Sequence, residues 1–128
     1  MEEGFEITAG VHFDAAHWLP GYPGPCARMH GHRWRVEAAV AGTQLDEKGI
    51  LLDFLELKGW LQETVAAFDH RCLNEVEPFT ERPPTSENLA RHVYGELARR
   101  IGEAAGKVRL SWVSVSESPE TRVVYRET

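Results

Sequence analysis

Hydrophobic and polar residues alternate strictly along the first part of the chain. The odd positions carry a mostly apolar series: Phe5, Ile7, Ala9, Val11, Phe13, Ala15 and His17. The even positions between them carry a mostly polar series: Glu6, Thr8, Gly10, His12 and Asp14. A period of two sustained over this length is typical of a strand with one buried face. We therefore predict a strand over residues 5–17, with His17 at the end of its apolar face.

A second strand is predicted from about His30 to Val40. One of its faces carries His30, His32, Trp34, Val36, Ala38 and Val40, and the other carries Arg33, Arg35 and Glu37. The connecting residues 18–29 are rich in proline and glycine, which break regular structure. The two strands are therefore expected to form an antiparallel pair joined by this loop.

Two helices and two further strands are predicted in the rest of the chain. Asp53 is suited to cap a helix that ends near Asp69, with apolar positions at Phe54, Leu57, Leu61, Val65 and Phe68. Thr85 or Ser86 is suited to cap a second helix that carries Leu89, Val93, Leu97 and Ile101. Strands are predicted at 107–117 and 122–126. This order indicates a single α+β domain over residues 1–128, with two helices on one face of an antiparallel sheet.

Composition and charge narrow the classes of function. The chain has 128 residues, of which 42% are hydrophobic, and a net charge of -6. An acidic chain without a basic run is poorly suited to nucleic acid, because phosphates are neutralised by clustered Lys and Arg. No apolar run approaches the roughly 18 residues that a membrane span needs. The first residues lack the features of a signal peptide, so we expect no membrane partner and a cytoplasmic location.

Three histidines are expected to meet at one end of the predicted strand pair. His17 ends the apolar face of the first strand, whereas His30 and His32 begin the apolar face of the second. A single histidine on an apolar face is usually a core residue, but three at one end of a hairpin are harder to explain in that way. Three imidazoles suit Zn²⁺ and leave a fourth coordination position open, as in catalytic sites. We predict that His17, His30 and His32 bind zinc.

Cys26 lies four residues before His30, in the loop next to the predicted metal site. A zinc cation and Arg28 nearby would both favour the thiolate, which makes Cys26 a candidate general base. The alternative is a structural buried thiol, the usual role of a lone cysteine.

Other polar residues are weaker candidates. Asp69 and His70 suit an acid–base pair, although a histidine at a helix end interacting with the helix dipole is an equal alternative. Glu117 ends a strand, where its carboxylate could receive the paired N–H groups of a guanidine-like ring or simply face solvent. The Thr85-Ser86-Glu87 segment is chiefly a helix start, with ligand contact as a second possibility.

Several motifs resemble those of the 6-pyruvoyltetrahydropterin synthase and 6-carboxytetrahydropterin synthase family. In order, they are Phe13-x-Ala15-Ala16-His17, Cys26-x-x-x-His30-Gly31-His32, Gly49-x-x-x-Asp53-Phe54-x-x-Leu57-Lys58, Asp69-His70-x-x-Leu73-Asn74, Pro84-Thr85-x-Glu87-Asn88-Leu89-Ala90 and Val115-x-Glu117. The resemblance covers about residues 5–126 and looks closest to the bacterial 6-carboxytetrahydropterin synthase branch. Ser118 stands where the family usually has Thr and Met29 where Leu is common, and we expect little effect from either.

The resemblance implies the tunnelling fold, in which four-stranded antiparallel sheets with two helices join into a barrel, usually as a homohexamer of two trimers with active sites at subunit interfaces. It implies a zinc lyase that converts 7,8-dihydroneopterin triphosphate to 6-carboxy-5,6,7,8-tetrahydropterin, acetaldehyde and triphosphate, on the route to queuosine. His17, His30 and His32 would bind zinc and Cys26 would accept a proton. Asp69 and His70 would form the acid–base pair, with His70 reaching a neighbouring subunit's site. Glu117 would hold the pterin, helped by Thr85, Ser86 and Glu87.

Two alternatives remain at this stage. The same scaffold could form 6-pyruvoyltetrahydropterin or cleave the dihydroneopterin side chain, because the same metal, Cys26 and His70 would serve. A non-catalytic zinc-binding module is the alternative from another class, although an open coordination position argues against it.

Overall fold

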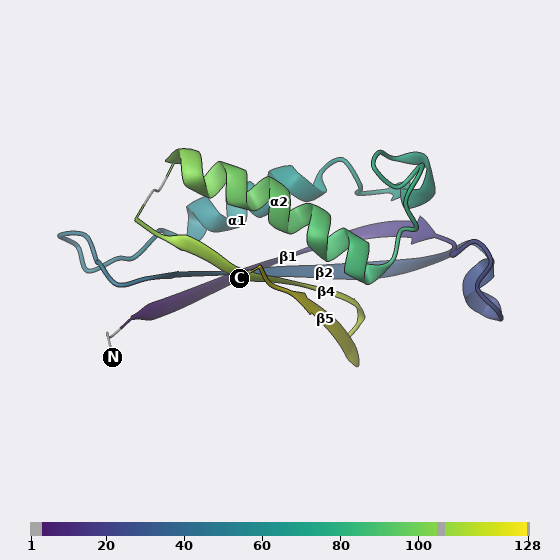
Figure 1. Cartoon of the computed structure of the whole chain (residues 1–128), viewed down its shortest axis with the longest axis horizontal. Coiled ribbons are helices and arrows are strands. Elements are labelled where there is room, and N and C mark those ends of the chain that lie inside the picture. The colour runs from purple at the N-terminus through teal and green to yellow at the C-terminus, as the bar shows by residue number, and fades with distance from the viewer. Residues whose placement is uncertain (1–3, 105–106, 128) are drawn as a thin grey trace.

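One sheet, covered on one face by two helices, makes up the described part of the chain (Figure 1). This computed structural model describes residues 4–104 and 107–127, so the ends of the predicted domain, 1–3 and 128, lie outside the described residues. The regular elements are β1 (Phe5–His17), β2 (His30–Gly42), α1 (Phe54–Val65), β3 (Arg71–Cys72), α2 (Ser86–Ala104), β4 (Arg109–Ser118) and β5 (Thr121–Tyr125). The strand order is β3-β1-β2-β4-β5.

The antiparallel pair of β1 and β2 confirms the strand prediction. His17 stands directly opposite His30, and Ala15 stands opposite His32. Because side chains alternate along a strand, this register points all three histidines to the helix-covered face. The pairing of β1 with β2 is therefore sufficient to place the three candidate metal ligands side by side, whatever the conformation of the connecting loop.

The prediction of a four-stranded antiparallel sheet is wrong in two respects: the sheet has a fifth strand, and that strand runs parallel to its neighbour. The sheet has five strands, because Arg71 and Cys72 form β3, which pairs parallel to β1 at Ala15 and Ala16. A two-residue strand has no periodicity that the sequence could reveal. A local turn places it there: His70 has a positive φ of 60°, and its N–H donates to the Asp14 carbonyl at 2.6 Å.

Both predicted helices are present. For α1, the prediction was wrong about the burial of Phe54 and about where the helix ends. Asp53 caps α1, since its side chain accepts a hydrogen bond from the Leu55 N–H at 2.8 Å. Leu57 and Leu61 are fully buried, as predicted, but Phe54 is 60% exposed. The helix ends at Val65 rather than near Asp69, and Phe68 reaches the core from the turn that follows.

The two faces of the sheet differ sharply in chemistry. The face beneath the helices holds the core, including the fully buried Trp34 and Val36, and Figure 1 shows both helices on this side. The opposite face, here called the open face, carries His12, Arg33 and Arg35, all exposed. Over residues 4–104 and 107–127, neither helix has the length and apolar content needed to cross a bilayer.

Candidate metal centre

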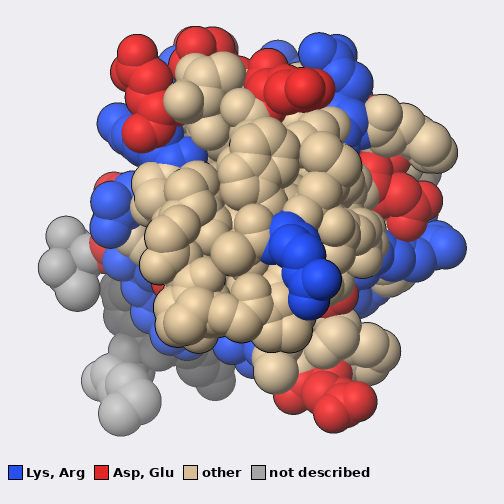
Figure 2. Space-filling model, turned by 90° about the vertical axis from the view of Figure 1, so that its right-hand side faces the viewer, with Lys and Arg blue, Asp and Glu red and all other residues tan. Residues whose placement is uncertain are grey.

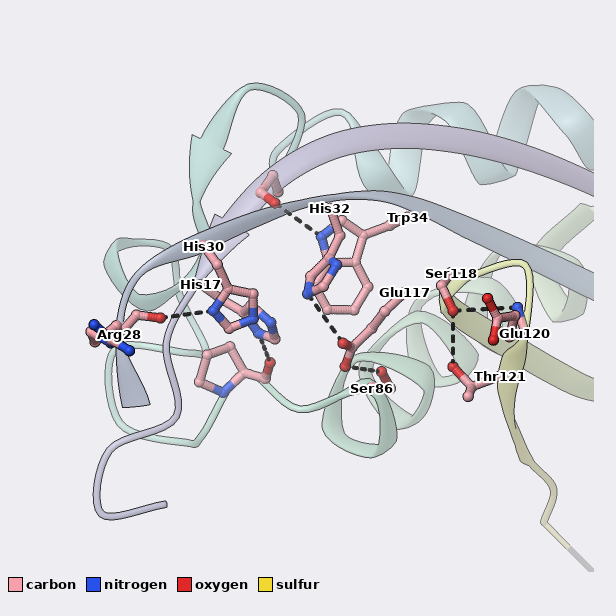
Figure 3. Close-up of polar contacts among 12 residues, drawn as sticks. His17, Arg28, His30, His32, Trp34, Ser86, Glu117, Ser118, Glu120 and Thr121 are labelled. Carbon is pink, nitrogen blue, oxygen red and sulfur yellow. Dashed lines mark hydrogen bonds and ion pairs between the residues drawn. The ribbon is translucent and has the colours of Figure 1, made fainter. Parts of the chain in front are cut away.

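Three imidazole rings meet where β1 ends and β2 begins (Figure 3). The ring centroid of His17 lies 4.6 Å from that of His30 and 5.2 Å from that of His32, and the His30 and His32 centroids are 4.8 Å apart. One ring nitrogen from each lies within 4.8 Å of the others. This spacing fits three ligands that share one ion, so the structure brings the predicted trio together.

Backbone carbonyls fix the orientation of two of these rings. His17 Nδ1 donates to the Pro84 carbonyl at 2.8 Å, and His30 Nδ1 donates to the Arg28 carbonyl at 2.7 Å. A carbonyl oxygen can only accept, so each Nδ1 carries the proton and each Nε2 keeps a free lone pair. This is the second contact that metal-ligating histidines commonly make.

The environment favours neutral imidazole, the form that binds metal. Burial lowers the pKa of His17, an effect that its hydrogen bond to the Pro84 carbonyl and the charge of Glu117 oppose in part. Burial also lowers the pKa of His32, again with Glu117 acting in the opposite direction. Nε2 of His17 and Nε2 of His32 are buried without a hydrogen-bond partner among the described residues. Buried nitrogens of this kind are costly unless something binds them, so the donor set fits a metal ion.

Glu117 on β4 lies beside the histidines, which favours the first of its two predicted roles, a carboxylate available to a ligand, over one that simply faces solvent. Its Oε2 is 3.1 Å from His32 Nε2, close enough for an ion pair but without the alignment of a hydrogen bond. Its Oε1 accepts from the Ser86 hydroxyl at 2.9 Å. Ser86 is buried at the start of α2, so the helix holds this carboxylate at the edge of the metal centre (Figure 3).

Cys26 is half-buried in the single turn of 3-10 helix at Pro25–Ala27. Its carbonyl accepts from the Leu19 N–H at 2.8 Å, which folds the 18–29 loop back on itself. The thiol does not join the three histidines in one group of mutually close ligand atoms. The structure therefore places Cys26 in the loop next to the centre and outside the coordinating set.

Asp69 and His70 form a pair, but not at this centre. His70 Nδ1 lies 3.0 Å from Asp69 Oδ1, and the His70 side chain is 78% exposed. The pKa of Asp69 is lowered, chiefly because its carboxylate accepts from the Asp14 N–H and also from His70. His70 lines a depression with Gly31, Arg33 and the candidate ligand His32. The ligand atoms of Asp69 and His70 nevertheless group with Asp14 and not with the three histidines, so the pair lies outside the candidate metal group of its own chain.

The remaining predicted residues lie at the start of α2. The Thr85 hydroxyl accepts from the Asn88 N–H at 3.1 Å, so its observed role is to cap the helix. Glu87 is exposed in the first turn. Of the three residues named from this segment, only Ser86 contacts another candidate.

Several residues around the centre escaped the sequence analysis. Trp34 is fully buried with its ring centroid 4.9 Å from that of His17, and its Nε1 donates to the Ala15 carbonyl at 3.2 Å. Asn74 exchanges two hydrogen bonds with the backbone of Trp18, the residue after His17. The sequence predicts Trp34 only as part of an apolar face and includes Asn74 only in a family motif, because neither pattern reveals which backbone groups a side chain will reach.

The surface at this end of the molecule is largely uncharged. Figure 2 views the end of the molecule at which β1 stops and shows a broad uncharged area with a Lys or Arg side chain within it. The 18–29 loop contributes one charged residue, Arg28, together with Tyr22 and Met29, which are 54% and 62% exposed. Exposed large hydrophobic side chains such as Tyr22 and Met29 are common at interaction sites.

Comparisons with known proteins agree with this geometry. The family model described as 6-pyruvoyl tetrahydropterin synthase matches residues 6–128. A 6-carboxy-5,6,7,8-tetrahydropterin synthase of Bacillus subtilis is 34% identical, over 95% of this chain and 85% of its own. A protein of the same name from Synechocystis is 37% identical, over 83% of this chain and 81% of its own. A Caenorhabditis elegans 6-pyruvoyl tetrahydropterin synthase structure has the same fold, with a TM-score of 0.85 at 24% identity, covering 99% of this chain and 98% of that one.

Proposed function

The chain belongs to the 6-pyruvoyl tetrahydropterin synthase family, and from that premise we propose that it is a 6-carboxytetrahydropterin synthase. It would convert 7,8-dihydroneopterin triphosphate to 6-carboxy-5,6,7,8-tetrahydropterin, acetaldehyde and triphosphate, a reaction that serves queuosine biosynthesis in the cytoplasm. The observation that carries the proposal is the convergence of His17, His30 and His32 with Glu117 beside them. The names of the bacterial relatives favour the carboxy branch.

His17, His30 and His32 would hold a zinc ion. When bound, zinc supplies a Lewis acid that polarises a substrate hydroxyl and eases its ionisation. The protein side of this task is already present, because two Nδ1–H groups are fixed by carbonyls and the Nε2 atoms are left free. Rings held in this way need little reorganisation on binding the ion.

Glu117 would anchor the pterin ring. A carboxylate with two oxygens matches the adjacent N–H groups of the amino-pyrimidine edge, since two parallel hydrogen bonds fix both position and orientation. Ser86 already engages one of these oxygens and orients the carboxylate. Thr85 and Glu87, at the same helix start, would complete the contacts to the ring.

Cys26 would accept a proton from the substrate side chain, and His70, oriented by Asp69, would return or remove one. The Asp69–His70 contact of 3.0 Å suits this role, because a carboxylate stabilises the charged imidazole. Since His70 lies outside the three-histidine group of its own chain, we propose that it serves the centre of a neighbouring subunit. The two groups would then come from different chains in one active site.

An oligomeric barrel follows from the same proposal. The edge of β1 before Ala15 and the outer edge of β5 have no strand partner in the described part of the chain. Open edges invite pairing with another strand, and a second copy offers a complementary one. The exposed side chains of Tyr22 and Met29, on the largely uncharged end of the molecule in Figure 2, would add apolar contact between copies. We propose a homohexamer of two trimers.

A sister activity is the second candidate, supported by the C. elegans 6-pyruvoyl tetrahydropterin synthase structure. Elimination of triphosphate to form 6-pyruvoyltetrahydropterin, or cleavage of the side chain, would use the same residues. Incubation of the zinc-loaded protein with 7,8-dihydroneopterin triphosphate, followed by mass spectrometry, separates these outcomes. A carboxylated pterin and acetaldehyde are expected. A pyruvoyl product would assign the sister activity, and no turnover would support a zinc-binding module instead.

A further inference from the structure

The open face of the sheet contains a pocket of about 600 Å³ that lies away from the metal centre. It is formed between β2 and the β4–β5 hairpin, with His12 of β1 at its border. We propose that this pocket binds a phosphoryl anion. Its assignment to the triphosphate of the substrate or product rests on the proposed function, whereas anion binding rests on the pocket alone.

The pocket gathers donors suited to phosphate oxygens. Arg33, Arg35 and Arg122 line it, and Ser116 and Thr121 contribute hydroxyl groups. Guanidinium groups bind phosphate through two parallel hydrogen bonds, and hydroxyl groups can donate one more each. The strand register places Arg35 directly opposite Ser116, so the two kinds of donor stand side by side.

A glycine makes room for one of these arginines. Gly10 lies in the middle of β1, where glycine weakens a strand unless another group approaches closely. A Cβ at this position would lie 2.8 Å from Nη2 and 3.1 Å from Cζ of Arg35. The Arg35 Nε also contacts Glu37 Oε1 at 3.3 Å. Arg35 is therefore held against the sheet, which lowers the entropy lost when it binds an anion.

The charge of the pocket is opposite to that of the chain. Three arginines and two glutamates, Glu37 and Glu120, line it, and one of these glutamates is already paired with Arg35. The Cζ atom of Arg122 lies 5.7 Å from the ring centroid of Trp112. Because a cation–π contact of this kind uses no hydrogen bond, the N–H groups of Arg122 are available to an anion. Arg33 has no ion-pair partner among the described residues. A locally cationic pocket on a chain of net charge -6 attracts anions selectively to this place.

Arg33 connects this pocket to the proposed proton-transfer pair. It also lines the neighbouring depression of about 500 Å³ with His70 and Arg71, where Asp14 is the acidic group. A substrate whose reacting carbons lie at His70 would therefore have Arg33, which lines both depressions, next to its phosphate chain. Binding of the triphosphate at Arg33 would thus align the substrate with His70, whichever subunit supplies the metal.

Titration of the zinc-loaded full-length protein with inorganic triphosphate by calorimetry tests the pocket without turnover. We expect saturable binding that weakens at least about tenfold in Arg33→Gln and in Arg122→Gln, the loss typical of one charge-assisted contact. Arg99→Gln is the matched control, since Arg99 lies on α2 over the other face and makes the same charge change. It should bind triphosphate within about twofold of wild type, which separates a local site from a net-charge effect. Thermal unfolding and zinc content confirm that each variant is folded.

Absence of saturable triphosphate binding, or equal weakening of that binding in all three variants, would overturn the proposal that this pocket binds an anion. The assignment to the substrate is tested separately by KM for 7,8-dihydroneopterin triphosphate, which should rise about tenfold in Arg33→Gln with little change in kcat. An unchanged KM would overturn that assignment. Triphosphate binding in a protein that turns over no pterin would support the anion site while the proposed function fails.

Discussion

Asn74 holds both polar backbone groups of Trp18. Its Oδ1 accepts from the Trp18 N–H and its Nδ2 donates to the Trp18 carbonyl, each at 3.0 Å. Trp18 directly follows His17, so this double contact fixes the chain next to a proposed metal ligand. A side chain from the segment after β3 therefore helps to position His17 on β1.

Replacing Asn74 with Ala is expected to weaken zinc binding. Two hydrogen bonds to partly buried groups would be lost, which corresponds to about 1–3 kcal/mol of stability. Urea unfolding measures the stability, and competition with a chelator measures zinc affinity. Thr80→Ala is the control, because it removes a 2.6 Å hydrogen bond to Glu77 that is exposed to solvent. Equal zinc affinity in wild type and Asn74→Ala would contradict the positioning role.

Cys26→Ala is expected to keep zinc and fold but to lose turnover. Removal of a general base typically slows a reaction by about 10²–10⁴-fold. Cys72→Ala is the matched control, since that thiol lies on β3 and its nearest polar contact is Asn74 Oδ1 at 3.9 Å. Turnover at the wild-type rate in Cys26→Ala would exclude Cys26 as the base.

Glu117→Gln should reduce affinity for the pterin ring while leaving zinc content unchanged. The amide keeps an oxygen for the Ser86 hydroxyl, but its nitrogen opposes the N–H groups of the amino-pyrimidine edge. Affinity for a pterin without phosphates, measured by fluorescence quenching, should fall about tenfold or more. Glu120→Gln on the β4–β5 turn makes the same charge change as a control. Loss of zinc in Glu117→Gln would instead assign Glu117 to the metal.

The metal-free protein should lose stability as pH falls below about 6.5. Burial lowers the pKa values of His17 and His32 from the ordinary 6.5, so the unfolded chain takes up protons first and is favoured in acid. Their stabilising contribution is present above pH 6.5 and declines until the pH reaches the lowered values. Urea unfolding at pH 7.5 and 5.5 measures the decline.

His92 needs a control in this experiment, because burial also lowers its pKa. A His92→Phe variant should retain the part of the decline that belongs to the metal histidines. The zinc-loaded protein should release metal over the same range as protons compete for the imidazoles. Zinc content that stays constant from pH 7 to 5 would contradict ligation by histidine.

Much of the fold and the convergence of the three histidines were predictable from the sequence, because strand alternation determines which side chains share a face. The alternation along β1 and β2 fixes which side chains share a face, and that alone brings His17, His30 and His32 to one end. By contrast, β3 was missed because its two residues are too short to carry a period, and its pairing depends on the turn at His70.

The burial of several individual side chains depends on tertiary packing, which sequence periodicity does not reveal. Phe54 follows the helical pattern of α1 but is its first residue, where it lines an open surface pocket with Phe5 and Ile7 and remains 60% exposed. His92 on α2 is half-buried, with its ring centroid 5.7 Å from that of Phe68 and 5.9 Å from that of Phe79, contacts that the helical period of α2 does not predict. The position of the His70 side chain could not be predicted either, because it depends on a turn in which His70 has a positive φ of 60° and its N–H donates to the Asp14 carbonyl.

The location of zinc in a crystal of the metal-loaded protein tests the central claim most directly. Anomalous scattering at the zinc edge should give a peak roughly 2.0–2.1 Å from one ring nitrogen of each of His17, His30 and His32. A peak at the exposed Asp14, Asp69 and His70 group instead, or none at the three histidines, would contradict the claim.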